Sequence, residues 1–170
     1  MAGPPGYCVD PSGLRETVEA TFVLLGSCAV LSEGGLRTAP DQPGVLTVLI
    51  SAEEDGSSLS VASEDELRSF FDGAEGRAAL SPDGRAESIL ILETRVDDGQ
   101  VYVRARDMSP LRPDGVDREY WRALFELNGR LVTATLLGFE VDPLEPEEGL
   151  ETLTALTARL FRENEPGLPE

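Results

Sequence analysis

Residues 120–139, YWRALFELNGRLVTATLLGF, decide the fold that the sequence predicts. The dipeptide Asn128-Gly129 divides this stretch into two strand-like runs. Both residues tolerate the positive φ of a type I′ turn, so Asn-Gly is the strongest short hairpin signal in the chain. Apolar side chains fall on both faces of the two runs. We therefore expect the hairpin to lie centrally in a sheet, or to meet a partner on one face.

The clearest strands predicted upstream of this hairpin lie at residues 45–50, 88–95 and 100–106, and a short strand at residues 58–61 can pair back on the first. Of the three clearest strands, the first two are aliphatic runs, and the third alternates apolar with polar residues, which is typical of a half-buried strand. Asp-Asp-Gly at residues 97–99 supplies a hairpin turn between the second and the third. Residues 88–139 are therefore predicted to form an antiparallel meander.

Two helices are predicted, one on each side of the meander in the sequence. Ser63 begins the first, because its hydroxyl and the Glu66 carboxylate can form a capping box, and Gly73 is expected to end it in a left-handed conformation. Pro146 begins the second, with glutamates in the first turn, where the helix dipole favours anions. Its predicted buried stripe consists of Leu150, Leu153, Leu156 or Thr157, Leu160 and Phe161.

The N-terminal segment carries mixed signals. Residues 1–13 are rich in glycine and proline and are expected to form a flexible arm. Residues 14–25 suit either a helical face or a buried strand, and we favour a helix, followed by a strand at residues 28–31. We expect a single domain over residues 14–163 and a frayed tail at residues 164–170.

The cysteines and the apolar runs bear on location. The longest apolar run, residues 20–31, is shorter than the ~20 residues that a membrane span needs. The N-terminus lacks the basic and apolar segments of a secretion signal. We therefore expect a cytoplasmic protein without membrane insertion, in which Cys8 and Cys28 stay reduced and Cys28 packs as a small apolar side chain.

The composition is strongly acidic, with 32 Asp and Glu against 14 basic residues and a net charge of −18. All 14 basic residues are arginine, and histidine is absent. No imidazole is available for acid–base catalysis or metal binding, and no lysine is available for a Schiff base. The negative charge repels phosphate backbones. These features predict a protein that is not an enzyme, needs no cofactor and binds no nucleic acid.

Acidic clusters stand at residues 53–55, 64–66 and 97–98. Predicted turns and helix caps explain them best. A divalent cation would need several converging oxygen ligands, and no segment has the spacing of an EF-hand loop. Because carboxylates from distant strands can pair in an active site, a small metal-assisted hydrolase stays open as an alternative.

A second polar pattern follows the predicted strands of the meander. Arginines and tyrosines alternate with apolar residues there, and arginine suits both carboxylate and aromatic partners. If the strands are neighbours, these side chains form a cationic binding face, whereas the alternative is cross-strand pairing with Glu93 or Glu126. The only tryptophan is either a core residue or the anchor of an interface. The candidate partner-binding residues are Tyr102, Arg104, Arg106, Tyr120, Trp121 and Arg122.

Residues 120–139, followed by PEEGLETLTALTARLFREN at residues 146–164, resemble the Mog1/PsbP-like family and its DcrB-like branch. An aromatic-rich strand, an Asn-Gly turn, a Thr/Leu strand and a closing helix carry the resemblance. It implies an α+β fold, an antiparallel meander sheet covered by helices in an α/β sandwich, and a non-enzymatic role in binding another protein. Some members are chaperones of secretion-system effectors. Small acidic type III secretion chaperones are a second, competing resemblance.

Together these features predict a cytoplasmic, non-enzymatic accessory protein that holds another protein. Its most concrete form is a chaperone of a secreted effector. One alternative is an immunity protein that neutralises a basic toxin through charge complementarity. The other is the small metal-assisted hydrolase with paired carboxylates. Whether the chain forms a homodimer stays open.

Overall fold

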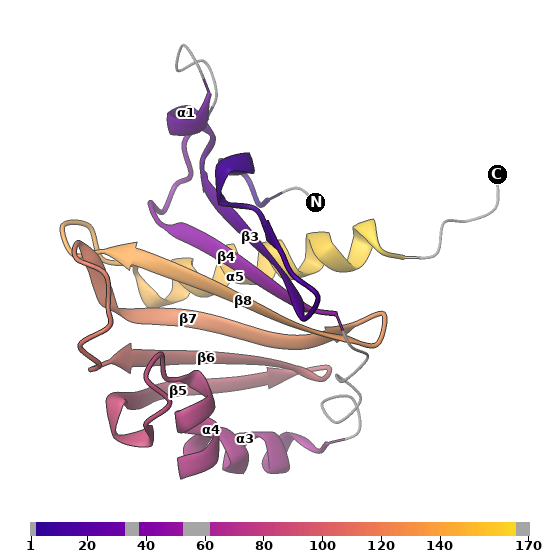
Figure 1. Cartoon of the computed structure of the whole chain (residues 1–170), viewed down its shortest axis with the longest axis vertical. Coiled ribbons are helices and arrows are strands. Elements are labelled where there is room, and N and C mark those ends of the chain that lie inside the picture. The colour runs from indigo at the N-terminus through magenta and orange to yellow at the C-terminus, as the bar shows by residue number, and fades with distance from the viewer. Residues whose placement is uncertain (1–2, 33–37, 53–61, 166–170) are drawn as a thin grey trace.

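The computed structural model describes residues 3–32, 38–52 and 62–165. The strands in this part of the chain form one antiparallel sheet in the order β1-β3-β4-β8-β7-β6-β5, with β2 also paired to β3 (Figure 1). Their bounds are β1 Tyr7–Val9, β2 Arg15–Glu16, β3 Ala20–Ser27, β4 Val45–Ser51, β5 Ile89–Asp97, β6 Gln100–Asp107, β7 Val116–Leu127 and β8 Arg130–Phe139. The predicted α+β class and the antiparallel meander, β5 to β8, are confirmed.

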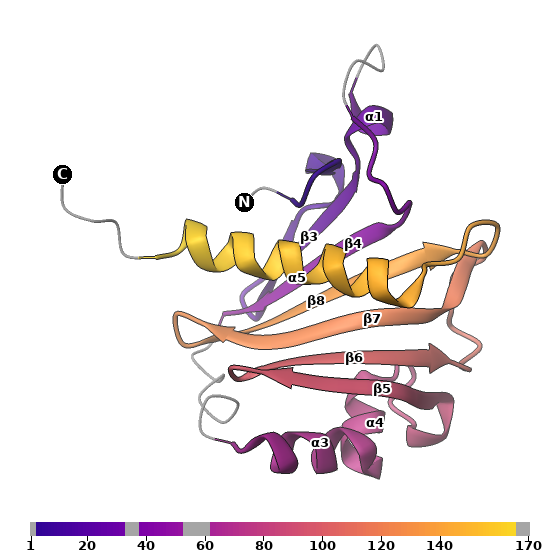
Figure 2. The same cartoon turned by 180° about the vertical axis from the view of Figure 1, so that it is seen from behind.

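Helices pack on both faces of this sheet. The long helix α5, Pro146–Glu163, lies on one face, and α3, Glu64–Asp72, and α4, Ala74–Leu80, lie on the other (Figures 1 and 2). We call these the α5 face and the α3–α4 face. The remaining short helices are η1, Pro11–Gly13, α1, Cys28–Leu31, and η2, Ala86–Ser88.

The hairpin of β7 and β8 has the turn that the sequence predicts. Asn128 has a φ of 52° and Gly129 a φ of 77°, the pair of positive values that a type I′ turn requires. Strand β8 pairs with β7 on one side and with β4 on the other, so the hairpin lies in the interior of the sheet. The expectation of a central hairpin is confirmed.

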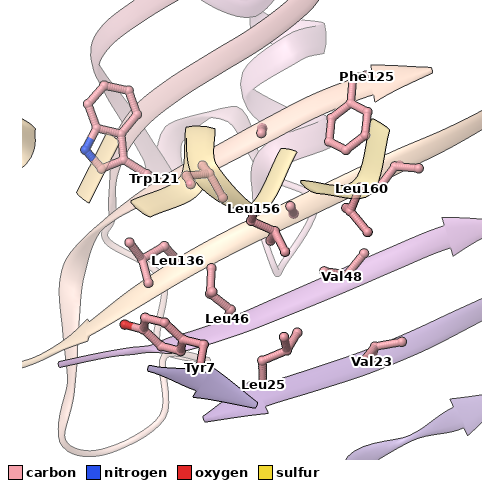
Figure 3. Packing of buried hydrophobic residues seen from close by; sticks show 14 of the residues in the cluster. Tyr7, Val23, Leu25, Leu46, Val48, Trp121, Phe125, Leu136, Leu156 and Leu160 are labelled. Carbon is pink, nitrogen blue, oxygen red and sulfur yellow. The ribbon is translucent and has the colours of Figure 1, made fainter. Parts of the chain in front are cut away.

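The α5 face carries the larger core (Figure 3). Helix α5 contributes Leu153, Leu156 and Leu160, which lie against side chains of β7, β8 and β4. A Cβ at Gly149 would come within 2.9 Å of Cδ1 of Trp121, so glycine lets the helix approach the indole. The indole Nε1 of Trp121 donates a hydrogen bond to the Pro146 carbonyl, at 2.9 Å. One tryptophan therefore positions the start of α5.

The α3–α4 face has a smaller core, built over β5, β6 and β7 by Leu67, Phe71 and Leu80. Helix α3 begins with the predicted capping box of Ser63 and Glu66. Gly73 is not left-handed, because its φ is −80° and its ψ is 171°. An extended residue at this point leads directly into α4, a helix that the sequence analysis did not predict.

The N-terminal predictions are wrong in three respects. Residues 14–25 form β2 and most of β3 instead of a helix, because β3 gains hydrogen-bonded neighbours on both sides, β1 and β4. Residues 28–31 form the short helix α1 instead of a strand. Residues 3–13 are not a loose arm, since Tyr7 is 3% exposed and its hydroxyl donates to the Gln42 carbonyl at 2.6 Å.

The C-terminal prediction is tested only in part. Helix α5 ends at Glu163, where the amide of Asn164 donates to the Phe161 carbonyl and its side-chain Nδ2 donates to the Leu160 carbonyl. Residues 166–170 of the expected tail, and the short strand expected at residues 58–61, lie outside the described residues.

The two cysteines form a disulfide, which corrects the expectation that they stay reduced. Strand β1 pairs with β3, opposing Cys8 to Gly26, and this register brings the Cα atoms of Cys8 and Cys28 to 5.0 Å. Disulfides persist mainly in oxidising compartments, so the bond weighs against the expected cytoplasmic location. In the described part of the chain, no helix is long and apolar enough to cross a membrane.

We predict that removing this bond destabilises the fold. The bond joins residues 20 positions apart, and closing such a loop is worth about 3 kcal/mol in the chain-entropy model. The double variant Cys8→Ala/Cys28→Ala should lose stability of that order in urea unfolding followed by circular dichroism. A reductant should destabilise the wild type to the same extent and leave the double variant unchanged. A wild type that is insensitive to reductant would contradict the prediction.

Candidate functional site

The six candidate residues of the meander do not form one surface. Trp121 lies opposite Arg104 across β6 and β7, so these two side chains share the α5 face, with Tyr102 and Arg106 two residues to either side of Arg104. Arg122 lies opposite Val103, and Tyr120 opposite Ala105, on the α3–α4 face. The register therefore divides the expected cationic face between the two sides of the sheet.

The three aromatic candidates are core residues. Tyr102 and Tyr120 are each 4% exposed, and Trp121 is 1% exposed. The hydroxyl of Tyr102 donates to Oε1 of Gln100 at 2.8 Å. In this structure none of the three rings presents a surface to a partner. Of the two alternatives for Trp121, a core residue or the anchor of an interface, the structure shows the core residue.

Arginines and glutamates alternate over the part of the α5 face that α5 leaves open. Arg104 lies between two carboxylates, 3.5 Å from Glu93 and 3.6 Å from Glu119. The ladder extends at both ends, and its outer pairs are Arg106–Glu119 at 2.6 Å, Arg95–Glu93 at 2.6 Å and Arg95–Glu147 at 3.1 Å. Pairing with Glu93, the alternative to a cationic face, is what the structure shows. We call these six side chains the ion-pair ladder.

Arg122 holds α4 on the sheet. Its Nη1 donates to the Leu80 carbonyl at 3.0 Å, and its Nε donates to Oγ1 of the buried Thr135 at 2.9 Å. Its guanidinium also lies over the Tyr120 ring, 5.0 Å from the centroid. Leu80 ends α4, where the helix dipole favours a cation. The Arg122 guanidinium thus has a structural role, since its contacts join α4 to the sheet.

We predict that Arg122 matters more to stability than Arg106, although the two lie on neighbouring strands. Arg122→Met should cost about 2 kcal/mol, because it leaves the buried Thr135 hydroxyl without its donor and leaves the Leu80 carbonyl with only the longer bond from the Tyr120 hydroxyl. Arg106→Met should cost about 0.5 kcal/mol or less, since its ion pair with Glu119 is 40% and 35% exposed and is screened by water. Urea unfolding of both variants checks this order, and equal losses would contradict it.

All three tyrosines are held in the neutral form by burial. Burial raises the pKa of Tyr7 to about 12. It also raises the pKa of Tyr102 and that of Tyr120 above the usual value. The phenolate is poorly solvated among apolar side chains, so the folded state retains protons that the unfolded chain releases.

This difference predicts alkaline unfolding. Because the pKa of each tyrosine is higher in the folded state, stability should not change below about pH 10 on account of these groups and should fall as the pH rises toward 12. Tyrosinate absorbance and circular dichroism, followed together, should show ionisation coinciding with loss of structure. Ionisation of one tyrosine at its ordinary pKa, with the fold intact, would contradict the prediction.

The α3–α4 face has a part that no helix covers. It runs over β3, β4 and β8, which face the viewer in Figure 1 with α3 and α4 below them and α5 behind. Leu49 lies opposite Phe22 on one side and Thr133 on the other, and it is 45% exposed. We call these side chains the open strip: Phe22, Leu24, Thr47, Leu49, Leu131 and Thr133, of which Leu24 forms the edge, where Gly13 of η1 packs on it. None of the six belongs to either core cluster.

The two helix-free parts of the sheet differ in chemistry. The ion-pair ladder presents three arginines and three glutamates, as expected of a sheet surface in contact with water. The six side chains of the open strip are apolar or threonine, and charged residues stand only at its edges, where Arg15 lies opposite Phe22 and Glu126 opposite Leu131. This contrast makes the open strip the candidate site.

One feature of the sequence bears on this strip. Residues 131–137 place apolar or threonine side chains on both faces of β8, which led to the expectation that the hairpin is central or meets a partner. The structure shows that Val132, Ala134 and Leu136 belong to the α5-face core, while Leu131 and Thr133 lie in the open strip. The contribution of β3 was missed, because that segment was expected to be helical.

The acidic clusters serve local structure where they are described. The carboxylate of Glu66 accepts a hydrogen bond from the Ser63 amide in the cap of α3, and Asp98 takes the positive φ of the β5–β6 turn. Residues 53–55 lie outside the described residues. Within residues 3–32, 38–52 and 62–165, no group of three or more His, Cys, Asp or Glu side chains is placed to hold a metal ion.

No protein-family model matches the chain, and comparisons with curated proteins and with solved structures find no match.

Proposed function

We propose that this chain is a non-enzymatic accessory protein that holds another protein on the open strip. The observation that carries the proposal is the contrast between two parts of one sheet, one lined by ion pairs and the other by apolar and threonine side chains. A large apolar side chain, Leu49, stands 45% exposed in the middle of the second part. A partner that covers it would complete the second core layer on that face.

Two forms of this function differ in the compartment and in the kind of partner that they require. A chaperone of a secreted effector, the form that the Mog1/PsbP-like resemblance suggests, would hold its client in the reducing cytoplasm and would have to function without the Cys8–Cys28 bond. An immunity protein for a basic toxin is favoured by the net charge of −18, which would speed association with a cation-rich surface. The Cys8–Cys28 disulfide favours an oxidising setting, so it supports the immunity protein more than the cytoplasmic chaperone.

Site-specific photo-crosslinking tests the proposal. A photoreactive amino acid placed at position 49 should trap a partner in cells of the source organism. The matched control is position 90, because Leu90 is 48% exposed on β5 and lies opposite Arg106, beside the ion-pair ladder. Crosslinks from position 49 and none from position 90 are the expected result.

The trapped protein should then be purified and titrated against two variants. Leu49→Asp should weaken its binding at least tenfold, and Leu90→Asp should leave it unchanged, with both variants keeping the circular dichroism spectrum of the wild type. Equal crosslinking from the two positions, or equal binding by the two variants, would overturn the assignment of the strip as the binding surface.

A further inference from the structure

The side chains around the open strip indicate the chemistry of the partner that would occupy it. This inference rests on the proposed function. Glu126 lies at one end of the open strip, directly opposite Leu131 in the β7–β8 pair. Its Oε2 is buried, and among residues 3–32, 38–52 and 62–165 it has neither a hydrogen-bond donor nor an ion-pair partner. A carboxylate oxygen removed from water without a donor is costly, so this position favours a partner that brings a cation or another donor.

The dimensions of the strip suit a single helix. On one side the strip is bounded by η1, because a Cβ at Gly13 would lie 2.6 Å from Cβ of Leu24. On the other side it is bounded by α4, whose last residue, Leu80, accepts a hydrogen bond from Arg122 on β7. Three strand spacings between these bounds span about 14 Å, close to the diameter of about 10–12 Å of a helix with its side chains. Along the strands, the strip extends over four residues, from the level of Thr47 to that of Leu131, which is about 13 Å or the length of about nine helical residues.

Area and charge both argue against a second copy of this chain as the occupant. The strip covers about 180 Å², against the roughly 800 Å² per partner that a stable interface buries. Two copies would also bring together chains that each carry a charge of −18. Helix α5, which covers the opposite face with Leu153, Leu156 and Leu160, shows how one amphipathic helix closes this sheet.

We propose that the open strip receives an amphipathic helix of a basic partner, with leucine-like side chains over Leu49 and a lysine or arginine on the Glu126 carboxylate. Such a helix would do on the α3–α4 face what α5 does on the other, and its cation would supply the missing donor to Oε2 of Glu126. The polar side of the helix would carry further basic residues toward the acidic surface.

Synthetic peptides test this without knowledge of the natural partner. The probe is a labelled peptide of about 18 residues with leucines three and four positions apart and lysines elsewhere. One control peptide carries glutamate in place of lysine, and a second alternates leucine and lysine in the period of a strand. Binding to the full, oxidised chain is followed by fluorescence anisotropy at physiological ionic strength.

Two pairs of variants separate the contacts. Leu49→Asp should weaken binding of the basic helical peptide at least tenfold although it adds negative charge, while Leu90→Asp, with the same added charge, should not. Glu126→Gln should weaken binding about tenfold, while Glu151→Gln, at an exposed position of α5, should leave it unchanged at the same net charge. Neither control peptide should bind comparably.

The outcomes distinguish this inference from the proposed function. If Leu49→Asp binds the basic helical peptide as the wild type does, the peptide does not use the strip, and the inference fails; the proposed function then stands or falls with the photo-crosslinks from position 49. A second outcome is that Leu49→Asp weakens binding but Glu126→Gln behaves like Glu151→Gln, or that a control peptide binds equally well. The strip is then a binding surface, but its occupant is not a basic helix. A wild-type dimer in light scattering that Leu49→Asp converts to a monomer would assign the strip to a second copy and overturn the inference.

Discussion

The pairing of β8 with β4 on one side and β7 on the other is the interaction on which the rest of the structure depends. It joins the N-terminal strands to the meander across a sequence gap of about eighty residues, as in the pairing of Val48 with Ala134. The same strand places Leu136 beside Trp121, and the indole in turn positions the first turn of α5. Without this pairing there would be two small sheets, and neither would present enough apolar surface for α5 to cover.

The joined sheet is wider than the helices that cover it, and this has consequences for function. Helix α5 covers the middle of one face, and α3 with α4 covers one end of the other. The surplus on the α5 face is made compatible with water by the ion-pair ladder. The surplus on the α3–α4 face is left apolar, and at its end lies a carboxylate oxygen that has no donor among the described residues. The candidate site is therefore a consequence of the mismatch between sheet width and helix number.

Features that depend on neighbours in the sequence were predictable. The Asn-Gly turn, the capping box at Ser63 and the proline start of α5 each satisfy backbone groups within a few residues, so their patterns transfer directly to structure. The segment that became β3 was not predictable in this way. Its apolar residues suit a helix or a strand about equally, and only hydrogen bonding to β1 and β4 decides between them.

The sequence by itself determined the class of the fold, the meander, the closing helix and an acidic chain that lacks the side chains of histidine and lysine chemistry. The tertiary structure alone decided which side chains share a face. Arg104 lies opposite Trp121 and not opposite Arg122, because the register between β6 and β7 is set by pairing along both strands, and a shift of one residue exchanges the two faces. The same dependence on pairing brought Cys8 to Cys28 and left the open strip without a helix, since each required strands distant in the sequence to align.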